Sequence, residues 1–335
     1  MDDFLSSYGL FLAKTVTLIA ALAGLVALVA FISWRRGRGR GHLDIRNVSE
    51  RYDNLSRAVK AGVLPKPLVK QEMKADKRRR KAERRQTGQQ ALAQQRPRLF
   101  VLDFHGDIRA SRVGGLREEV TAILTIANAQ DEVLVRLENT GGLVHDHGLA
   151  ASQLQRIKDR QIPLTVAVDK VAASGGYLMA CVADRIVAAP FAILGSIGVI
   201  AQLPNFHRLL DRYGIDFEQF KGGQFKRTVT MFGRNTDADR EKFNAEIQDV
   251  HNLFKEFVER HRPQVDLAQV ATGEYWYGTR ALDLRLVDEL ITSDDYLLAR
   301  RAQAGIYEVR YAQRISQRAR LGSLVTGLLD RPWFA

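Results

Sequence analysis

The chain has 335 residues, of which 46% are hydrophobic and 26% charged, as is usual for a globular protein. Its net charge of +12 lies in one segment, because residues 35–96 hold nineteen Lys and Arg against six Asp and Glu, whereas residues 97–335 hold thirty of each sign. A folded body without net charge or a zinc-finger or RNA-binding motif argues against nucleic acid as a partner. The single cysteine, Cys181, excludes an intramolecular disulfide and a Cys-based metal cluster.

The first segment, residues 1–34, is predicted to be a membrane anchor. Thr15–Trp34 is a run of twenty uncharged residues, which as a helix spans a hydrocarbon core of about 30 Å. A cleaved signal peptide ending near residues 21–23 is the alternative, but the acidic residues 2 and 3 stand where such a peptide is basic. The basic flank at 35–40 places the following body in the cytoplasm by the positive-inside rule.

Two segments flank the body, and the first of them has too few large apolar residues to form a core of its own. Residues 35–96 are predicted to be a basic linker, extended or helical and solvated, which serves as a charged spacer or lies on anionic lipid headgroups. The tail, residues 311–335, is interpreted as a membrane-surface helix, a subunit contact or a loosely packed terminus.

The body, residues 97–310, alternates strand and helix patterns. Apolar runs of strand length alternate with helical periodicity, which predicts parallel strands with helices on their faces, an α/β fold. The expected strands are 98–104, 132–138, 163–169 and 185–190, and the expected helices are 116–128 and 143–160. Thr236 and Asp239 form a capping-box pattern that begins a long helix to about Arg262, and Pro263 ends it.

Residues 186–206 contain no charged residue, so a second membrane span has to be weighed against a buried core. Pro190, Gly195 and Pro204 break this run into short pieces. Doubly buried parallel strands also give apolar runs, and the core interpretation is therefore favoured.

The stretch "KVAASGGYLMA" at 170–180 puts Ser174 after a buried strand and before a helix that starts with two glycines. The unpaired N–H groups and the dipole of such a helix start suit an oxyanion beside a nucleophilic serine. The alternative is a structural residue at a closely packed helix start. Ala172 stands where the G-x-S-x-G elbow has glycine, and Cys181 is expected to be a small buried residue.

A nucleophilic serine needs a base, and the residue types offer two candidates. The motif "HDH" holds His145 and His147, which suggests a triad or a metal site, but residues at i and i+2 point to different sides of a helix and no third ligand accompanies them. No metal site is therefore predicted. A lysine, as in Ser-Lys enzymes, is the second candidate.

Several stretches resemble the signal peptide peptidase (SppA) family of serine-lysine membrane peptidases over most of the body. They are "KVAASGGYLMACVADRIVAAPFAILGSIGVIAQLPN" (170–205), "RLENTGGLVHDHGLAASQLQRIKD" (136–159), "GGQFKRTVT" (222–230), "FKEFVERHRP" (254–263) and "VATGEYWYGTRALDLRLVDE" (270–289), together with "YGLFLAK" (8–14). So many agreeing stretches are far more specific than one motif.

The resemblance implies a role for each site residue. Ser174 corresponds to the nucleophile, Lys226 to the general base and Ser196 to the serine that orients the lysine, while Gly142 and Gly175 correspond to the oxyanion-hole donors. A lysine base must be neutral, which requires burial and no carboxylate partner.

Two positions depart from the family pattern. Thr140 in "NTGG" replaces the proline of the family's "SPGG", which loosens the turn. Arg285 replaces a common glycine, so the local turn must differ if that position needs a positive φ.

The resemblance also implies a ClpP/crotonase-like β-β-α superhelix with an N-terminal transmembrane helix, assembled as a homo-oligomer. The expected reaction is hydrolysis of apolar peptides, such as remnant signal peptides or membrane-protein fragments, through an acyl-enzyme and without a cofactor. The expected location is the bacterial inner membrane; the charge rule favours a cytoplasmic body, whereas such peptidases are often assigned to the outer side. A catalytically silent membrane scaffold and an acyl-CoA enzyme of the same fold are the alternatives.

Overall fold

A computed structural model describes residues 10–21, 24, 41–85 and 96–312. The chain divides into two compact units, Ile45–Arg310 and a second unit made of Met1–Asp44 with Tyr311–Ala335. In the second unit, residues 10–21 and 24 are helical. Most of the predicted anchor and nearly all of the tail lie outside the described residues. Within the described ranges, no helix is both long enough and apolar enough to cross a membrane.

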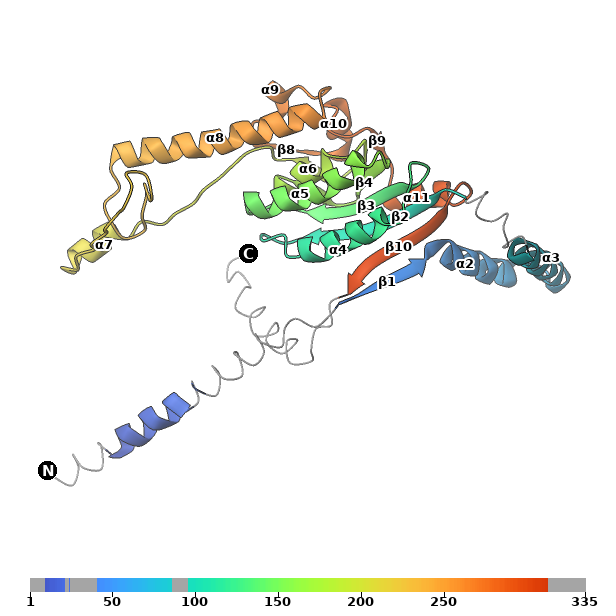
Figure 1. Ribbon diagram of the computed structural model, residues 1–335, viewed down its shortest axis with the longest axis horizontal. Helices are drawn as coiled ribbons and strands as arrows, with labels where there is room; N and C mark the ends of the chain where they lie inside the picture. Colours follow the sequence, from blue (N-terminus) through green and yellow to red (C-terminus); the bar gives the residue numbers. More distant parts are fainter. Residues whose placement is uncertain (1–9, 22–23, 25–40, 86–95, 313–335) are drawn as a thin grey trace. The chain divides into compact units, whose positions relative to one another are not determined.

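One ten-stranded sheet organises the described chain (Figure 1). Among the described strand pairs other than β1 with β10, all are parallel except β7 with β8, so the prediction of an α/β fold with parallel strands is confirmed. Its main path runs in the order β1 (His42–Asn47), β10 (Gly305–Ala312), β2 (Arg98–Gly106), β3 (Glu132–Asn139), β4 (Leu164–Val168), β6 (Arg185–Ala188) and β9 (Glu289–Leu290).

Three short strands leave this path and position the candidate site. β5 (Val171–Ala173) meets the end of β3, where Ala172 pairs with Asn139. β5 also pairs with β7 (Ile193–Gly195), and β7 pairs with β8 (Tyr275–Tyr277). The chain therefore turns away from the main sheet just before Ser174.

The alternation of side chains along β2 explains the layers on the two faces of the sheet. Leu102 and Phe104 belong to the larger core cluster, with residues of α4 (Val113–Leu124), α5 (Val144–Asp159) and α6 (Gly175–Ala180). Leu99 and Val101 point to the other face and pack with residues of α2 (Val48–Val63) and α11 (Ser293–Arg300). Both faces are covered, which is why the strands are apolar almost throughout.

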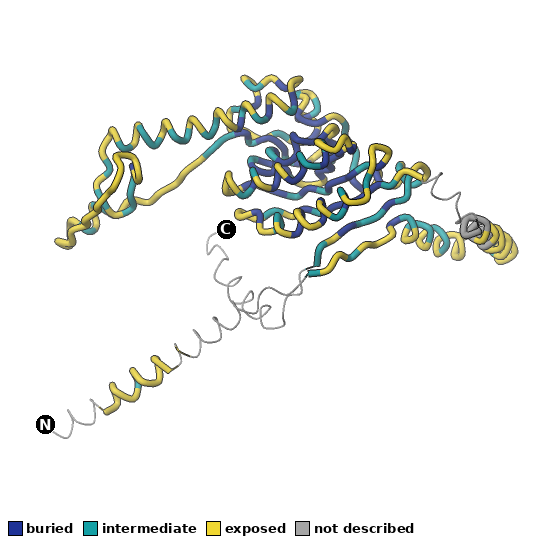
Figure 2. The backbone as a smooth tube through the Cα atoms, viewed as in Figure 1, coloured by how far each residue is buried: buried dark blue, intermediate teal, exposed yellow. Residues whose placement is uncertain are grey.

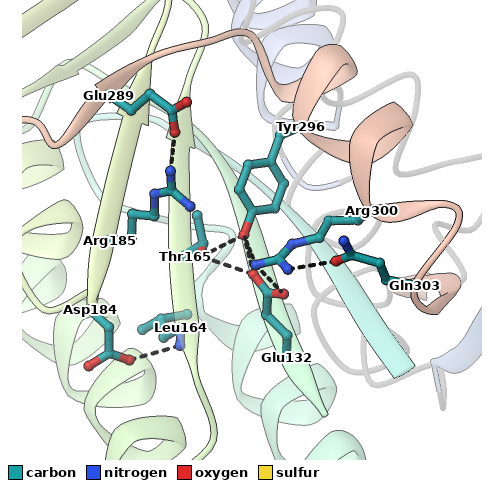
Figure 3. Close-up of polar contacts among 9 residues, drawn as sticks. All are labelled: Glu132, Leu164, Thr165, Asp184, Arg185, Glu289, Tyr296, Arg300 and Gln303. Atoms are coloured by element: carbon teal, nitrogen blue, oxygen red, sulfur yellow. Dashed lines mark hydrogen bonds and ion pairs between the residues drawn. The ribbon is translucent and has the colours of Figure 1, made fainter. Parts of the chain in front are cut away.

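A polar network holds α11 on its face of the sheet (Figure 3). The Tyr296 hydroxyl donates to Glu132 and lies 3.1 Å from the Thr165 hydroxyl, and Arg300 forms an ion pair with Glu132 at 3.2 Å. The residues come from β3, β4 and α11. They lie at the beginnings of the strands, away from the strand ends that carry Ser174.

The long helix α8 (Asp237–His261) begins with the predicted capping box, in which Thr236 and Asp239 bond to each other's backbone N–H groups. At its end, the buried Arg262 donates to both carboxylate oxygens of Asp288 at 2.8 Å. Two short helices follow, α9 (Leu267–Val270) and α10 (Gly278–Asp283). The C-terminal end of α8 is therefore tied to the body, whereas its N-terminal end lies away from the sheet, on the side of α7 (His207–Arg212) (Figure 1).

The turn after α10 shows how Arg285 fits a position where glycine is expected. Arg285 has φ 59°, in the left-handed region. Its carbonyl accepts a hydrogen bond from Arg262 Nη2 at 2.9 Å. The positive φ is kept, and the arginine backbone adopts it at a cost that glycine would not have.

The segment predicted as linker contains regular structure. β1 and α2 lie within residues 41–63, and Val48 and Tyr52 of α2 pack in the second core cluster. α3 (Lys66–Arg85) has no buried residue among its described side chains. The segment therefore combines a packed first part with a basic, solvated helix.

The uncharged run at 186–206 lies in the core over its first part. Ile186, Val187, Leu194 and Ile197 are all fully buried in strands β6 and β7 or just after them. The rest of the run enters an exposed segment, where Ile200 is 77% exposed. The core interpretation is thus confirmed for the part that forms strands.

Candidate active site

Ser174 occupies a strained turn between β5 and α6. Its backbone has φ 52° and ψ −120°, a conformation rare for a residue with a side chain, and its N–H donates to Gly195 O at 2.8 Å. Although it stands at the N-cap of α6, its side chain makes no capping hydrogen bond. The half-buried hydroxyl is therefore not used to cap the helix, and strain at such a turn is typical of functional residues.

The two glycines after Ser174 permit a very close approach of α6 to its neighbours. A Cβ on Gly175 would lie 2.5 Å from Cγ of His147, and a Cβ on Gly176 would lie 2.2 Å from the carbonyl oxygen of Asn139. Tight packing and a candidate nucleophile are thus both properties of this stretch.

The "NTGG" turn lies directly beside Ser174. Gly141 and Gly142 have φ 93° and 156°, which only glycine adopts readily. A Cβ on Gly141 would lie 2.7 Å from Ser174 Cβ and 2.8 Å from Gly175 N. Within the part of the chain that the structure describes, the N–H groups of Gly142 and Gly175 donate no hydrogen bond. The two predicted oxyanion donors therefore come from adjacent segments and are both free for a ligand.

Ser196 is brought to the neighbouring strand end. β5 and β7 run parallel with Ala173 opposite Gly195, so Ser174 and Ser196 follow paired residues. Ser196 has φ 50°, and its N–H donates to Glu274 O at 2.7 Å. The structure thus gathers four of the five predicted site residues around the ends of β3, β5 and β7.

Lys226 lies elsewhere, in a segment that projects from the body between β7 and α8. We call residues 199–236 the arm. Lys226 is exposed, and the adjacent Phe225 is 55% exposed with its ring 5.1 Å from the ammonium of Lys242. Among the described residues, no hydrogen bond or ion pair joins Lys226 to Ser174. The structure of one chain therefore shows Lys226 exposed on the arm, without a contact to Ser174.

The arm is held together by a few contacts of its own. Asn205 Nδ2 donates to the carbonyl oxygens of Thr230 and Gly233, and Phe206 N–H donates to Met231 O at 2.7 Å. The Phe232 ring packs against Phe206 and Phe217. Figure 2 shows that most of the arm is exposed, in contrast to the sheet. Its exposed large apolar residues include Ile200, Leu203, Leu209, Tyr213, Ile215 and Phe220.

The histidines of "HDH" have different surroundings. His145 is exposed and lies 3.7 Å from the Asp146 carboxylate. His147 is fully buried, and its two ring nitrogens face Leu143 O and Asn139 Oδ1. In the described ranges, no hydrogen bond joins Ser174 to a histidine, and no group of three His, Cys, Asp or Glu side chains is arranged to hold a metal. The link between His147 and Asn139, eight residues earlier, was not foreseen from the sequence.

Cys181 ends α6 and is fully buried, as predicted. Burial raises the pKa of its thiol well above the ordinary value. A reactive thiolate is disfavoured at this position.

A cavity of about 320 Å³ lies at the ends of β2, β3 and β4 on the α11 side of the sheet. Four of its charged groups form two ion pairs, Arg136 with Asp103 and Lys170 with Glu138. None of the predicted site residues lines it.

A serine on a strained turn beside two glycine amides is an arrangement that suits a serine hydrolase. Comparison with known proteins gives the family. Residues 3–154 match Peptidase family S49 N-terminal, and residues 156–306 match Peptidase family S49. The chain belongs to peptidase family S49 and is a serine peptidase.

Relatives with similar sequences carry protease names. A Haemophilus influenzae protein named "Probable protease SohB" is 45% identical over 319 residues, covering 93% of this chain and 90% of the relative. A Buchnera aphidicola protein of the same name is 44% identical over 312 residues, with 93% and 91% coverage. An Enterococcus faecium protein named "Putative signal peptide peptidase SppA" is 28% identical over 167 residues, covering 49% of this chain and 48% of the relative. The resemblance to the SppA family is thus confirmed, and a peptidase is favoured over the scaffold and acyl-CoA alternatives.

Proposed function

We propose that this peptidase is an endopeptidase that uses Ser174 as nucleophile and Lys226 as general base. Ser174 Oγ attacks the substrate carbonyl while Lys226 takes its proton, and the N–H groups of Gly142 and Gly175 stabilise the oxyanion. The proton then goes to the leaving amine, and water hydrolyses the acyl-enzyme. The observation that carries the proposal is the strained Ser174, whose φ is 52° and whose hydroxyl does not cap α6.

We propose that Lys226 acts on Ser174 of a second copy in a homo-oligomer. Lys226 is exposed on the arm, whereas a neutral lysine base needs burial. The arm also exposes many large apolar residues, as surfaces that pack in an assembly do. Docking of the arm on a neighbouring body would bury both the apolar residues and Lys226. Ser196, next to Ser174 across β5 and β7, would then orient the amine.

We infer that the substrates are extended apolar peptides, for example remnant signal peptides or membrane-protein fragments. Three apolar side chains beside the oxyanion turn are exposed, namely Ile108 (69%), Leu143 (42%) and Val144 (50%). Ile108 O accepts from Leu143 N–H at 2.8 Å, which holds them together. This surface suits apolar residues next to the scissile bond. The branching of β5, β7 and β8 from the sheet fits the ClpP/crotonase-like superhelix that we propose for the fold.

We also propose that the chain is anchored in the bacterial inner membrane by Thr15–Trp34. The basic helix α3 has ten Lys and Arg against three Asp and Glu and would lie on anionic headgroups, at about 1 kcal/mol per basic residue near the surface. The basic flank after the anchor favours a cytoplasmic body. Fractionation of membranes, followed by protease treatment of spheroplasts, tests both statements; release by salt alone would exclude an anchor, and cleavage of the body would place it outside.

The dyad is tested with fluorogenic apolar peptides and purified full-length protein. Ser174→Ala and Lys226→Ala should each lose about 10⁴-fold or more in kcat, as when members of other catalytic units are removed. Lys221→Ala, an exposed lysine of the same arm, is the matched control and should keep activity. Retained activity in Ser174→Ala would end the proposal.

Mixing the two inactive variants tests whether the dyad forms between copies. In a mixed oligomer, some sites combine Ser174 of one chain with Lys226 of another. About a quarter of the sites should be intact in an equal mixture, if each site takes one residue from each of two copies. No recovery in a mixture that demonstrably exchanges subunits would place the dyad within one chain.

A further inference from the structure

The backbone that carries Gly142 is held by two buried polar side chains, Asn139 and His147, which are 1% and 0% exposed. Asn139 Oδ1 accepts from Gly141 N–H at 2.9 Å and lies 3.2 Å from His147 Nε2. On its other side, His147 Nδ1 lies 2.9 Å from Leu143 O; because both oxygens can only accept, His147 donates from whichever ring nitrogen carries the proton. The two side chains thus bridge the residue before Gly142 and the residue after it.

The same pair contacts the segment that carries the second donor. The ring of His147 lies against Gly175, where a Cβ would come within 2.5 Å of Cγ. Asn139 lies against Gly176 and sends Nδ2 to Met179 Sδ at 3.4 Å. The contacts of this pair therefore converge on the two backbone segments that hold the free N–H groups.

A turn containing two glycines needs such support. Gly141 and Gly142 have no side chain to restrict their backbone, and Thr140 does not fix φ as a proline there would. An Asn side chain that bonds the N–H two residues on supplies the restriction by a hydrogen bond instead. Gly106 leaves the space for it, since a Cβ at that position would lie 2.3 Å from Asn139 Cγ.

Resting on the proposed function, we propose that Asn139 and His147 are positioning residues that form a clamp, here the Asn139–His147 clamp, which sets the distance and direction of the Gly142 and Gly175 donors around Ser174. The clamp touches neither the substrate nor the reacting atoms. It acts on the transition state through the two amides, because an oxyanion donor displaced by about 1 Å costs on the order of 10²-fold in rate.

The primary test compares kcat and KM for apolar fluorogenic peptides. Asn139→Ala and His147→Ala should lower kcat by about 10–100-fold with KM within about 3-fold, since the donors act on the transition state more than on the bound peptide. The double variant should lose about as much as one single variant, because the two residues act as a unit. Tyr296→Phe, which removes hydrogen bonds of another buried network, should lose stability but keep kcat.

Graded variants separate positioning from folding. Asn139→Ser keeps an acceptor for Gly141 N–H but is too short to reach His147. His147→Asn keeps a donor near the Nδ1 position. Each of these variants should have a kcat between that of the wild type and that of the corresponding Ala variant. Adding Thr140→Pro to Asn139→Ala should recover at least 3-fold in kcat, because proline fixes φ where the side-chain bond is lost. Should Asn139→Ala fail to fold, Asn139→Ser with Thr140→Pro replaces it in the same comparison.

The rate of Ser174 labelling by a fluorophosphonate gives a second measurement, independent of the peptide chosen. It should fall in the clamp variants in the same ratio as kcat. Unchanged kcat and labelling in folded clamp variants would overturn the inference, as would equal losses in Tyr296→Phe. If Ser174→Ala stays active, the proposed function itself fails; if only the clamp variants stay fully active, the clamp alone fails.

Discussion

The turn that holds Ser174 and the arm that holds Lys226 are built in opposite ways. Around Ser174, five residues at the strand ends have positive φ and the neighbouring glycines have no room for a Cβ; they are Gly141, Gly142, Ser174, Gly195 and Ser196. In the arm, Gly214, Gly222 and Gly223 have no atom within 4 Å of a Cβ position. In the proposed mechanism, the amides that bind the developing charge are fixed by the chain itself, whereas the lysine that a neighbouring copy supplies is presented on an exposed, loosely packed segment.

The largest expected difference is between a glycine of each region. Gly175→Ala should destabilise the protein by about 1–3 kcal/mol and lower activity by more than about 100-fold, because the methyl group overlaps His147 beside an oxyanion donor. Gly222→Ala should leave activity unchanged and alter stability by less than about 1 kcal/mol, since its site is open. Urea unfolding and kinetics measure both. Similar effects in the two variants would show that the contrast in packing has no functional meaning.

A second comparison concerns charges in the body and near the arm. Burial of the Asp131 carboxyl alone would raise its pKa, but hydrogen bonds from the Arg98 side chain and from the backbone of Asn128 and Arg98 lower the pKa below its usual value. Its stabilising contribution is therefore present above the pKa of an unfolded Asp, about 3.9, and is lost as pH falls through the folded value.

Asp131→Asn should thus lower the free energy of unfolding by about 2 kcal/mol at pH 7, through loss of hydrogen bonds to a charged group. The difference from the wild type should shrink as pH falls below about 4. Glu246→Gln, which removes an exposed pair with Lys242 on α8, should change stability by at most about 0.5 kcal/mol. Chemical unfolding at several pH values checks this prediction. If the difference in free energy of unfolding between the wild type and Asp131→Asn grew as pH fell, the expected pH dependence would be wrong.

The smallest expected effect tests strain that has no catalytic use. Arg285 has φ 59° and is not one of the predicted site residues, so Arg285→Gly should stabilise the protein by about 1 kcal/mol through relief of that conformation. The carbonyl that accepts from Arg262 is retained. A shift of the urea midpoint without a change in kcat is expected. Destabilisation would mean that the contacts of the Arg285 side chain contribute more to the free energy of unfolding than its left-handed backbone conformation costs.

Hydrophobic periodicity and capping patterns were sufficient to predict the strands and helices that form the layers of the body. The strands at 98–104 and 132–138 and the capping box at Thr236 were predicted correctly, because each depends on residues close in sequence. The role of His147 was not, since its partner Asn139 belongs to a strand and the bond forms only when α5 packs against the end of β3. Residue type alone does not distinguish a buried structural histidine from a metal-binding histidine.

The sequence by itself determined the α/β alternation, the small residues around Ser174 and the uneven charge, because these follow from local pattern and composition. Tertiary structure decided which residues meet. It placed the NTGG turn beside Ser174, because the end of β3, 35 residues earlier in the chain, pairs with β5. It paired β5 with β7, so that Ser196 lies next to Ser174, and it left Lys226 exposed on the arm. The reason is physical: local propensity acts within a few residues, whereas the distance between two functional groups depends on the packing of the elements that carry them.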